Sequence, residues 1–335
     1  MCVDDVGPGL GPAEIAVEQP PDAKAPANVR AILRVGNEFF LRSIDGMVAA
    51  QNGDLIAALI FNTLWIANVR HITHSAANTQ FRGLDDMPPD ALRRPVSVQA
   101  LANTLRIPYE TVRRYVQTMI RKGDCIRVGK RGLIVPAAVH SQPHRRESLR
   151  AGLPSLMRFL DDLKLAGFDF SPYRRTLANT VPASGKTPAN ARALMRAGMD
   201  LIMHGVDSIG RLHGNDFLAG MICTTIWTAN LRHITCSRDN LKYGGLDQLP
   251  PDDARRPVKV NAIAAALQLP YETTRRSVSK LVRAGVVVRI EGRGVIFPRA
   301  QFARPDYYEA ARQSYAQIVH TVSDLHRAGF DFRKY

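Results

Sequence analysis

Apolar residues recur at the three- and four-residue spacing of an α-helix over most of this chain, so the pattern predicts a mainly helical protein. Two such stretches are residues 29–51 and 54–75, and a third covers 147–166 and ends at Gly167, a residue type common after helix ends. The second stretch is apolar on most faces, which is typical of a helix inside a larger helical body. Its continuous apolar part, residues 55–69, is too short and too polar to span a membrane, and no membrane partner is expected.

A shorter pattern of two helices and a hairpin follows the apolar helices. Ser97 is a suitable N-cap for the first helix, because a hydroxyl accepts a hydrogen bond from a free backbone N–H. A turn at residues 106–108 leads into a second helix over 109–122, and Gly123 marks its end. Alternating apolar residues on both sides of a glycine-bounded turn at 129–132 then predict a β-hairpin.

The same order of patterns occurs twice. Residues 28–173 align without a gap with residues 190–335, and about 40% of the aligned positions are identical. We call these stretches copy one and copy two. The sequence Trp65-Ile-Ala-Asn-Val-Arg-His-Ile-Thr, for example, returns as Trp227-Thr-Ala-Asn-Leu-Arg-His-Ile-Thr, and both tryptophans are expected in the core rather than in a ligand site. Two copies are too few for a solenoid, so we expect a duplicated module that makes one chain a pseudo-dimer.

The segments outside the copies have the composition of linkers. Residues 1–27 are rich in Pro, Ala and Gly, carry five acidic residues and one Lys, and are expected to be disordered. Residues 174–189 contain two Pro and a Ser-Gly pair, which favours a flexible connector between the copies.

The distribution of charge narrows the range of partners. The chain has 45 Lys and Arg against 30 Asp and Glu, a formal net charge of +15. Residues 93–131 hold ten basic and two acidic residues, and residues 255–293 hold nine and two. A solvated surface spreads its charges whereas a binding surface concentrates them, so each stretch is expected to contact a polyanion. Aromatic residues are only 7% of the chain, which argues against an extended surface for stacking bases.

The second helix of each short pattern has one apolar face and one face rich in Arg, amide and hydroxyl groups, which fits a DNA major groove. The DNA contacts expected in copy one are Arg93, Arg94, Tyr109, Glu110, Thr111, Arg113, Arg114, Gln117, Thr118, Arg121, Lys130 and Arg131. Those expected in copy two are Arg255, Arg256, Tyr271, Glu272, Thr273, Arg275, Arg276, Ser279, Lys280, Arg283 and Arg293. Arg114 and Arg276 lie opposite the apolar face and are expected to read bases. The arginine pairs at 93–94 and 255–256 are expected to hold phosphates.

Together these motifs resemble the winged helix-turn-helix of bacterial transcriptional regulators, with the GntR, IclR and MarR groups nearest in style. The resemblance rests on Ser97-Val-Gln-Ala-Leu-Ala-Asn-Thr-Leu, Ile107-Pro-Tyr-Glu-Thr-Val-Arg-Arg, the Gly129-Lys-Arg-Gly hairpin tip and, in copy two, Gly292-Arg-Gly. It implies a mainly α fold of two tandem winged-helix modules with flanking helices in a pseudo-two-fold arrangement. The winged-helix cores would cover residues 93–136 and 255–298.

The resemblance also implies a function. We expect a cytoplasmic, nucleoid-associated transcriptional regulator that binds double-stranded DNA sequence-specifically, one chain covering a pseudo-palindromic operator as a pseudo-dimer. Further pairing as a homodimer and an unidentified small-molecule effector stay open. Two other classes also stay open: a replication initiator with two winged helices, and a winged-helix protein-interaction module of the chromosome-structure kind.

No enzyme, cofactor or metal site is expected. The sequence contains no glycine-rich phosphate loop, nucleophile elbow or paired carboxylates in a plausible setting. His71 and His74 stand one helical turn apart, as do His233 and Cys236, but two ligands per copy are too few for a metal. The four Cys include no CxxC pair, which fits a reducing cytoplasm.

Overall fold

The order of elements repeats along the chain, as the duplicated sequence predicts. The computed structural model of the protein describes residues 25–73, 79–130, 132–181, 188–236 and 242–335, and within them the protein is mainly helical with two small antiparallel hairpins. Most of the tail that was expected to be disordered, and part of the expected connector, lie outside the described residues.

Each copy contains two long helices, a short unit of two helices and a hairpin, and a closing pair of helices. In copy one these are α1 (Val29–Ala49), α2 (Leu55–Thr73), α3 (Val98–Leu105), α4 (Tyr109–Lys122), β1 (Ile126–Val128), β2 (Gly132–Ile134), α5 (Ala137–His140) and α6 (Pro143–Leu165). In copy two they are α7 (Ala191–Leu212), α8 (Phe217–Thr235), α9 (Val260–Ala266), α10 (Tyr271–Arg283), β3 (Val288–Ile290), β4 (Gly294–Ile296), α11 (Arg299–Phe302) and α12 (Pro305–Arg327). Short 3-10 helices lie at Thr79–Phe81, Asp90–Leu92 and Ser171–Tyr173.

The helix ends follow local sequence chemistry. The hydroxyl of Ser97 accepts a hydrogen bond from the N–H of Ala100 at 3.1 Å and caps α3, as the sequence predicts. Gly123 ends α4 in the left-handed conformation, with φ of 77°. Helix α6 begins at Pro143 rather than at residue 147, because the first position of a helix needs no backbone N–H.

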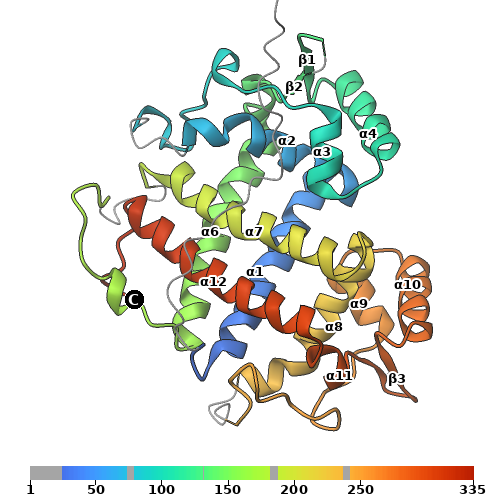
Figure 1. Ribbon diagram of the computed structural model, residues 1–335. Helices are drawn as coiled ribbons and strands as arrows, with labels where there is room; N and C mark the ends of the chain where they lie inside the picture. Colours follow the sequence, from blue (N-terminus) through green and yellow to red (C-terminus); the bar gives the residue numbers. More distant parts are fainter. Residues whose placement is uncertain (1–24, 74–78, 131, 182–187, 237–241) are drawn as a thin grey trace, which may run out of the picture.

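Four long helices, α1, α6, α7 and α12, pack together in the middle of the molecule, and the two short units lie at opposite ends of this group (Figure 1). Glycines allow two of the crossings to be close. A side chain at Gly36 of α1 would meet Ile318 of α12 at 2.8 Å, and one at Gly198 of α7 would meet Leu156 of α6 at 3.2 Å. The first helix of each copy therefore packs against the last helix of the other copy.

Two buried arginines tie the copies together reciprocally. Arg30 of copy one donates three hydrogen bonds, at 3.0–3.2 Å, to carbonyls within residues 243–246 of copy two. Arg192, at the same position in copy two, donates to the carbonyls of Gly83 and Leu84 in copy one. Burial lowers the pKa of each guanidinium to about 10, so both stay charged at neutral pH.

The C-terminal segments of the two copies also meet. Phe170 and Phe332 occupy equivalent positions in the aligned copies, and their rings stack with centroids 5.4 Å apart. Tyr335 packs against both of them. Residues that contact their own equivalents, together with reciprocal arginine contacts, are what a two-fold axis produces.

The apolar core is shared unequally between the copies. One continuous cluster joins the central helices with α2 and with the short unit of copy one, which contributes Leu101, Val112 and Val116. The short unit of copy two has a separate cluster with α8, built around residues such as Val278 and Val295. The copy-one unit is therefore part of the central core, whereas the copy-two unit has its own cluster, which meets the central one at Trp227 and Leu267.

Helix α2 is longer than its continuous apolar run suggests. Over the 18 residues Leu55–Ile72 it is long and apolar enough to cross a membrane by length and composition alone, and 44% of this window is buried in the protein. It packs against α1, α3, α4, β2 and α7. The ring of its Trp65 packs at a tilt against the ring of His140 with centroids 4.5 Å apart, so this tryptophan is a packing residue as expected.

Candidate nucleic-acid interface

A third short strand completes the hairpin of each unit. Val96 and Leu133 exchange backbone hydrogen bonds of 3.0 and 2.9 Å, and Val258 and Val295 do the same in copy two. A Cβ atom at Gly294 would lie 2.3 Å from the carbonyl oxygen of Val258, so only glycine fits beside this strand. The strand runs directly into the first helix of the unit and thereby holds helix and hairpin in one arrangement.

A left-handed residue forms the turn between the two helices of each unit. Arg106 has φ of 54° and Gln268 has φ of 50°. Each turn is followed by a proline, Pro108 or Pro270, after which the second helix begins. The two turns have the same geometry although their first residues differ, so α4 and α10 project from their units in the same way.

The two faces of α4 and α10 differ as the sequence predicts. Val112, Val116 and Met119 of α4 are buried, and so are Thr274, Val278 and Leu281 of α10. On the other faces, the exposed residues are Tyr109, Glu110, Arg114, Gln117 and Arg121 of α4, and Tyr271, Glu272, Thr273, Arg275, Arg276, Lys280 and Arg283 of α10. The half-buried ones are Thr111, Arg113, Thr118 and Ser279. Each unit thus presents one helix with a polar and cationic outer face.

An ion pair at the start of each outer face neutralises the positive charge of one arginine. Glu110 contacts Arg113 at 2.8 Å, and Glu272 contacts Arg275 at 2.9 Å. Hydrogen bonding from Arg275 lowers the pKa of Glu272 below its ordinary value, so this glutamate stays ionised. The next arginine in each helix, Arg114 or Arg276, extends the exposed cationic face beyond the pair.

The outer faces differ in the last turns of the helices. In α4, Arg121 donates to the hydroxyl of Thr118 at 3.0 Å. In α10, Lys280 stands at the position of Thr118 and contacts Asp216, the N-cap residue of α8, at 3.0 Å. Copy two therefore holds a cation of its outer face against its own apolar helix.

The hairpin tips carry exposed cations. Lys130 follows Gly129, which has φ of 61°, and Arg293 follows Gly292, which has φ of 65°. Both cationic side chains are exposed. Arg131 lies outside the described residues.

The sequence Arg-Arg-Pro-Val occurs at residues 93–96 and again at 255–258. The first arginine of each motif is not a surface residue, and the prediction that it holds phosphates is wrong. The side chains of Arg93 and Arg255 are 0% exposed. Arg93 donates to the carbonyl of Pro88 at 3.0 Å and contacts Asp90, and burial lowers its pKa. Arg255 makes the equivalent bond to the carbonyl of Pro250. Each arginine fixes the Pro-Pro-Asp loop of its own copy, residues 88–90 or 250–252. A buried charge with such partners does not leave them for a phosphate.

The second arginine of each motif is exposed, and a hydrogen bond of its main chain holds it in place. The N–H groups of Arg94 and Arg256 donate to the carbonyls of Asn68 and Asn230 at 3.0 and 3.1 Å, and both arginine side chains face solvent. Of each predicted phosphate-binding pair, one arginine is thus available to a ligand.

Two asparagines outside the predicted site residues position the hairpins. Asn68 is fully buried and bonds to the carbonyls of Arg94 and Leu133 and to the N–H of Val135, at 2.8–3.0 Å. Asn230 makes the equivalent three bonds in copy two. A polar residue repeated at the same position in both apolar helices was the signal available in the sequence.

Two of the four possible metal ligands named from the sequence are histidines that bond to backbone carbonyls. A ring nitrogen of His71 bonds to the carbonyl of Leu92 at 2.8 Å, and His233 bonds to the carbonyl of Ala254 at 3.0 Å. Cys236 is an exposed free thiol, and His74 lies outside the described residues. Among the described residues, no group of three or more His, Cys, Asp or Glu is placed to hold a metal.

Among the described residues, those predicted to contact DNA are therefore brought together in two equivalent units, except for the two buried arginines. Comparisons of the chain with protein-family models, curated proteins and solved structures find no match.

Proposed function

We propose that the two short units are winged helices and that the protein is a sequence-specific, double-stranded DNA-binding transcriptional regulator. In this proposal α4 and α10 enter successive major grooves, and the hairpins contact the backbone beside them. The observation that carries the proposal is the pair of equivalent outer faces, each with an exposed arginine, Arg114 or Arg276, opposite a buried apolar face. Exposed cations at Arg94, Arg256 and the hairpin tips supply backbone contacts.

The reciprocal packing of the copies supports binding to an inverted repeat. Arg30 and Arg192 make matching contacts, and Phe170 meets its equivalent Phe332, as expected of partners related by a two-fold axis. Two reading helices related in this way face half-sites of opposite direction. One chain then covers one pseudo-palindromic operator without a second chain.

The half-sites are expected to be similar but unequal. Gln117 is replaced by Ser279, and Thr118 is replaced by Lys280. A glutamine can form two hydrogen bonds to adenine, which serine cannot. The contact of Lys280 with Asp216 further distinguishes the outer face of copy two.

Selection of bound fragments from genomic DNA, followed by footprinting and a salt titration, tests the proposal. We expect one protected site with inverted half-sites, and a log–log salt slope of about −5 or steeper, since each neutralised phosphate adds about −0.9. Arg158→Ala is a suitable control, because Arg158 is exposed on α6, outside both units.

Other outcomes would point to the other classes. A slope near −1 would mean that the exposed cations are not the contact surface. Protection of tandem direct repeats together with duplex unwinding would favour a replication initiator. Absence of a footprint, with partner binding that persists in high salt, would favour a protein-interaction module.

A further inference from the structure

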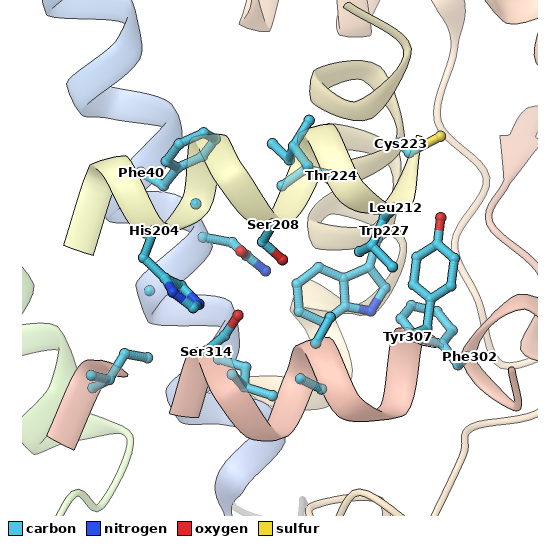
Figure 2. A pocket seen from close by; sticks show the side chains of 18 of the residues that line it. Phe40, His204, Ser208, Leu212, Cys223, Thr224, Trp227, Phe302, Tyr307 and Ser314 are labelled. Carbon is cyan, nitrogen blue, oxygen red and sulfur yellow. The ribbon is translucent and has the colours of Figure 1, made fainter. Parts of the chain in front are cut away.

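A cavity of about 140 Å³ lies where copy one meets copy two. It is bounded by α1 of copy one and by α7, α8 and α12 of copy two. Figure 2 shows His204, Ser208, Trp227 and Ser314 gathered about one space between these helices. An apolar cavity of roughly 150 Å³ is large enough to hold a benzene ring, so this one has room for a ring-sized molecule.

The walls of the cavity are mainly apolar, but two buried nitrogens face no partner. Among the described residues, Trp227 Nε1 and His204 Nε2 find no hydrogen-bond partner, and neither does Trp65 Nε1 at the equivalent position of copy one. Indole N–H groups only donate, so the only polar group that could pair with Trp227 Nε1 is an acceptor. A buried polar group without a partner costs free energy, and a ligand that supplies an acceptor removes that cost.

The charged and titratable groups around the cavity favour an uncharged ligand. Arg30 is already bonded to three backbone carbonyls. Burial lowers the pKa of His204 and of His213 to about 4, so both rings are neutral at pH 7. The second of these rings also contacts the hydroxyl of Tyr307 at 3.2 Å. An anion would find no unoccupied positive charge among the lining residues.

The equivalent place in copy one is filled. Phe61 stands where copy two has Cys223, and Leu149 stands where it has Ala311. The guanidinium of Arg145, the equivalent of Tyr307, lies over the Phe61 ring at 4.1 Å. The cavity is therefore a property of copy two that the duplication alone does not explain.

One wall of the cavity belongs to the hairpin of copy two. Phe297 follows directly after β4, and its N–H donates to Asn230 at 2.8 Å. Its ring packs against Phe302 and Tyr307, with centroids 5.0 and 5.4 Å away. A molecule in the cavity would touch the same aromatic group that supports the base of the hairpin.

We propose that this cavity binds an uncharged, ring-sized, mainly apolar molecule that carries a carbonyl acceptor, held by Trp227 and His204. We further propose that its occupancy alters the DNA affinity of copy two through Phe297, and only this second part rests on the proposed function. The two parts are separable, because ligand binding can be measured without DNA.

The protein contains only two tryptophans, which gives a direct probe. The Trp65→Phe variant, labelled with 5-fluorotryptophan, reports on Trp227 alone by ¹⁹F NMR. Titration with acetophenone should shift its resonance saturably. Ethylbenzene, which lacks the carbonyl, should bind about five-fold more weakly, and benzoate should bind no better than ethylbenzene.

Two substitutions that copy the residues of copy one should close the cavity. Ala311→Leu and Cys223→Phe, each in the Trp65→Phe background, should abolish the saturable shift, while Ala151→Leu on the exposed face of α6 should not. Thermal unfolding of each variant checks that it is folded, and either cavity variant alone suffices if the other does not fold. Equal acetophenone binding by a folded cavity variant and by Ala151→Leu would overturn the site.

The remaining outcomes separate the parts of the proposal. Equal affinities for acetophenone and ethylbenzene would overturn the acceptor requirement. Saturable binding that leaves the affinity for the selected DNA site unchanged would overturn the coupling to the hairpin. If the protein bound no DNA at all, the proposed function would fail while the cavity measurement still decided the ligand site.

Discussion

The two short units have the same element order and turn geometry but are anchored differently. The copy-one unit shares the central core, and Arg106 of its turn contacts Asp207 of α7 at 3.5 Å. The copy-two unit has a separate core, and Gln268 replaces Arg106. His140 packs against Trp65 in copy one, whereas in copy two Phe302 packs against Trp227 and lines the cavity.

The comparison shows that two units of the same local geometry can rest on different layers of side chains. The hydrogen bonds of Asn68 and Asn230 are the same, so both hairpins are positioned locally in the same way. The difference lies in the layer below, where Phe61 is replaced by Cys223 and Leu149 by Ala311. The smaller side chains Cys223 and Ala311 line the cavity beside the copy-two unit.

The largest expected effect tests what the units have in common. Arg114→Ala and Arg276→Ala should each weaken binding to the selected operator by about 1–3 kcal/mol and relax sequence preference at one half-site. The double variant should lose the sum, about 2–6 kcal/mol, because the positions lie in separate units. Fluorescence anisotropy on operator and random DNA measures this, and an equal loss on both DNAs would contradict base reading by these residues.

The next largest effect is a loss of stability that should differ in extent between the two apolar clusters. Asn68→Ala and Asn230→Ala should each lower local stability by about 3 kcal/mol, because buried backbone groups lose their partners. In copy one the loss should spread into the central helices, whereas in copy two it should stay within the unit. Hydrogen exchange resolves these patterns.

Asn62→Ala provides the control for this comparison. Asn62 bonds only within its own helix, to the carbonyl of Ala58, and its removal should cost less than about 0.5 kcal/mol. Identical exchange patterns in the two main variants would show that the cores are not separate.

Acid should lower the free energy of unfolding of the protein in part through His140 of copy one. Burial, with the nearby Arg93, lowers the pKa of this ring to about 3, below its ordinary value. The unfolded chain therefore binds a proton that the folded chain does not, and stability falls as the pH drops below about 6.5. Between pH 6.5 and 5 the loss from this one group is about 2 kcal/mol.

His140→Phe, which introduces the residue of copy two, should remove that share of the acid sensitivity. His204 and His213 should keep their own shares, since their pKa values are also depressed, to about 4. Chemical unfolding at a series of pH values measures the difference. An unchanged dependence on pH in a folded His140→Phe variant would show that His140 does not titrate as described.

The smallest expected effect concerns the difference between the DNA half-sites that α4 and α10 recognise. The double change Ser279→Gln with Lys280→Thr gives α10 the corresponding residues of α4, and should shift preference toward a perfect palindrome by about 1–2 kcal/mol. The lost contact of Lys280 with Asp216 is exposed, so stability should change by less than about 1 kcal/mol. Competition between symmetric and asymmetric operators measures the shift, and an unaltered preference would mean that these positions do not read DNA.

Features set by neighbouring residues could be predicted from the sequence. The cap at Ser97, the stop at Gly123, the two faces of α4 and the hairpin turns depend on residues a few positions apart. Their chemistry is local, so the pattern of residues is sufficient.

Features set by distant backbone could not be predicted in the same way. Arg93 looked like a surface cation because its sequence neighbours are basic, but its side chain is buried against the carbonyl of Pro88. Asn68 is satisfied by groups of the hairpin that lie far along the chain. The cavity depends on which residues of α1 in copy one face α12 of copy two. Trp227, which was expected in the core, lines this cavity.

The central claim is that one chain replaces a dimer, and the mass of the complex with DNA tests it most directly. Light scattering on the protein bound to a short operator, combined with a footprint, should give one chain on one site with two unequal, inverted half-sites. Two chains on that same short site would contradict the claim, because the reading helices would then pair between chains rather than within one.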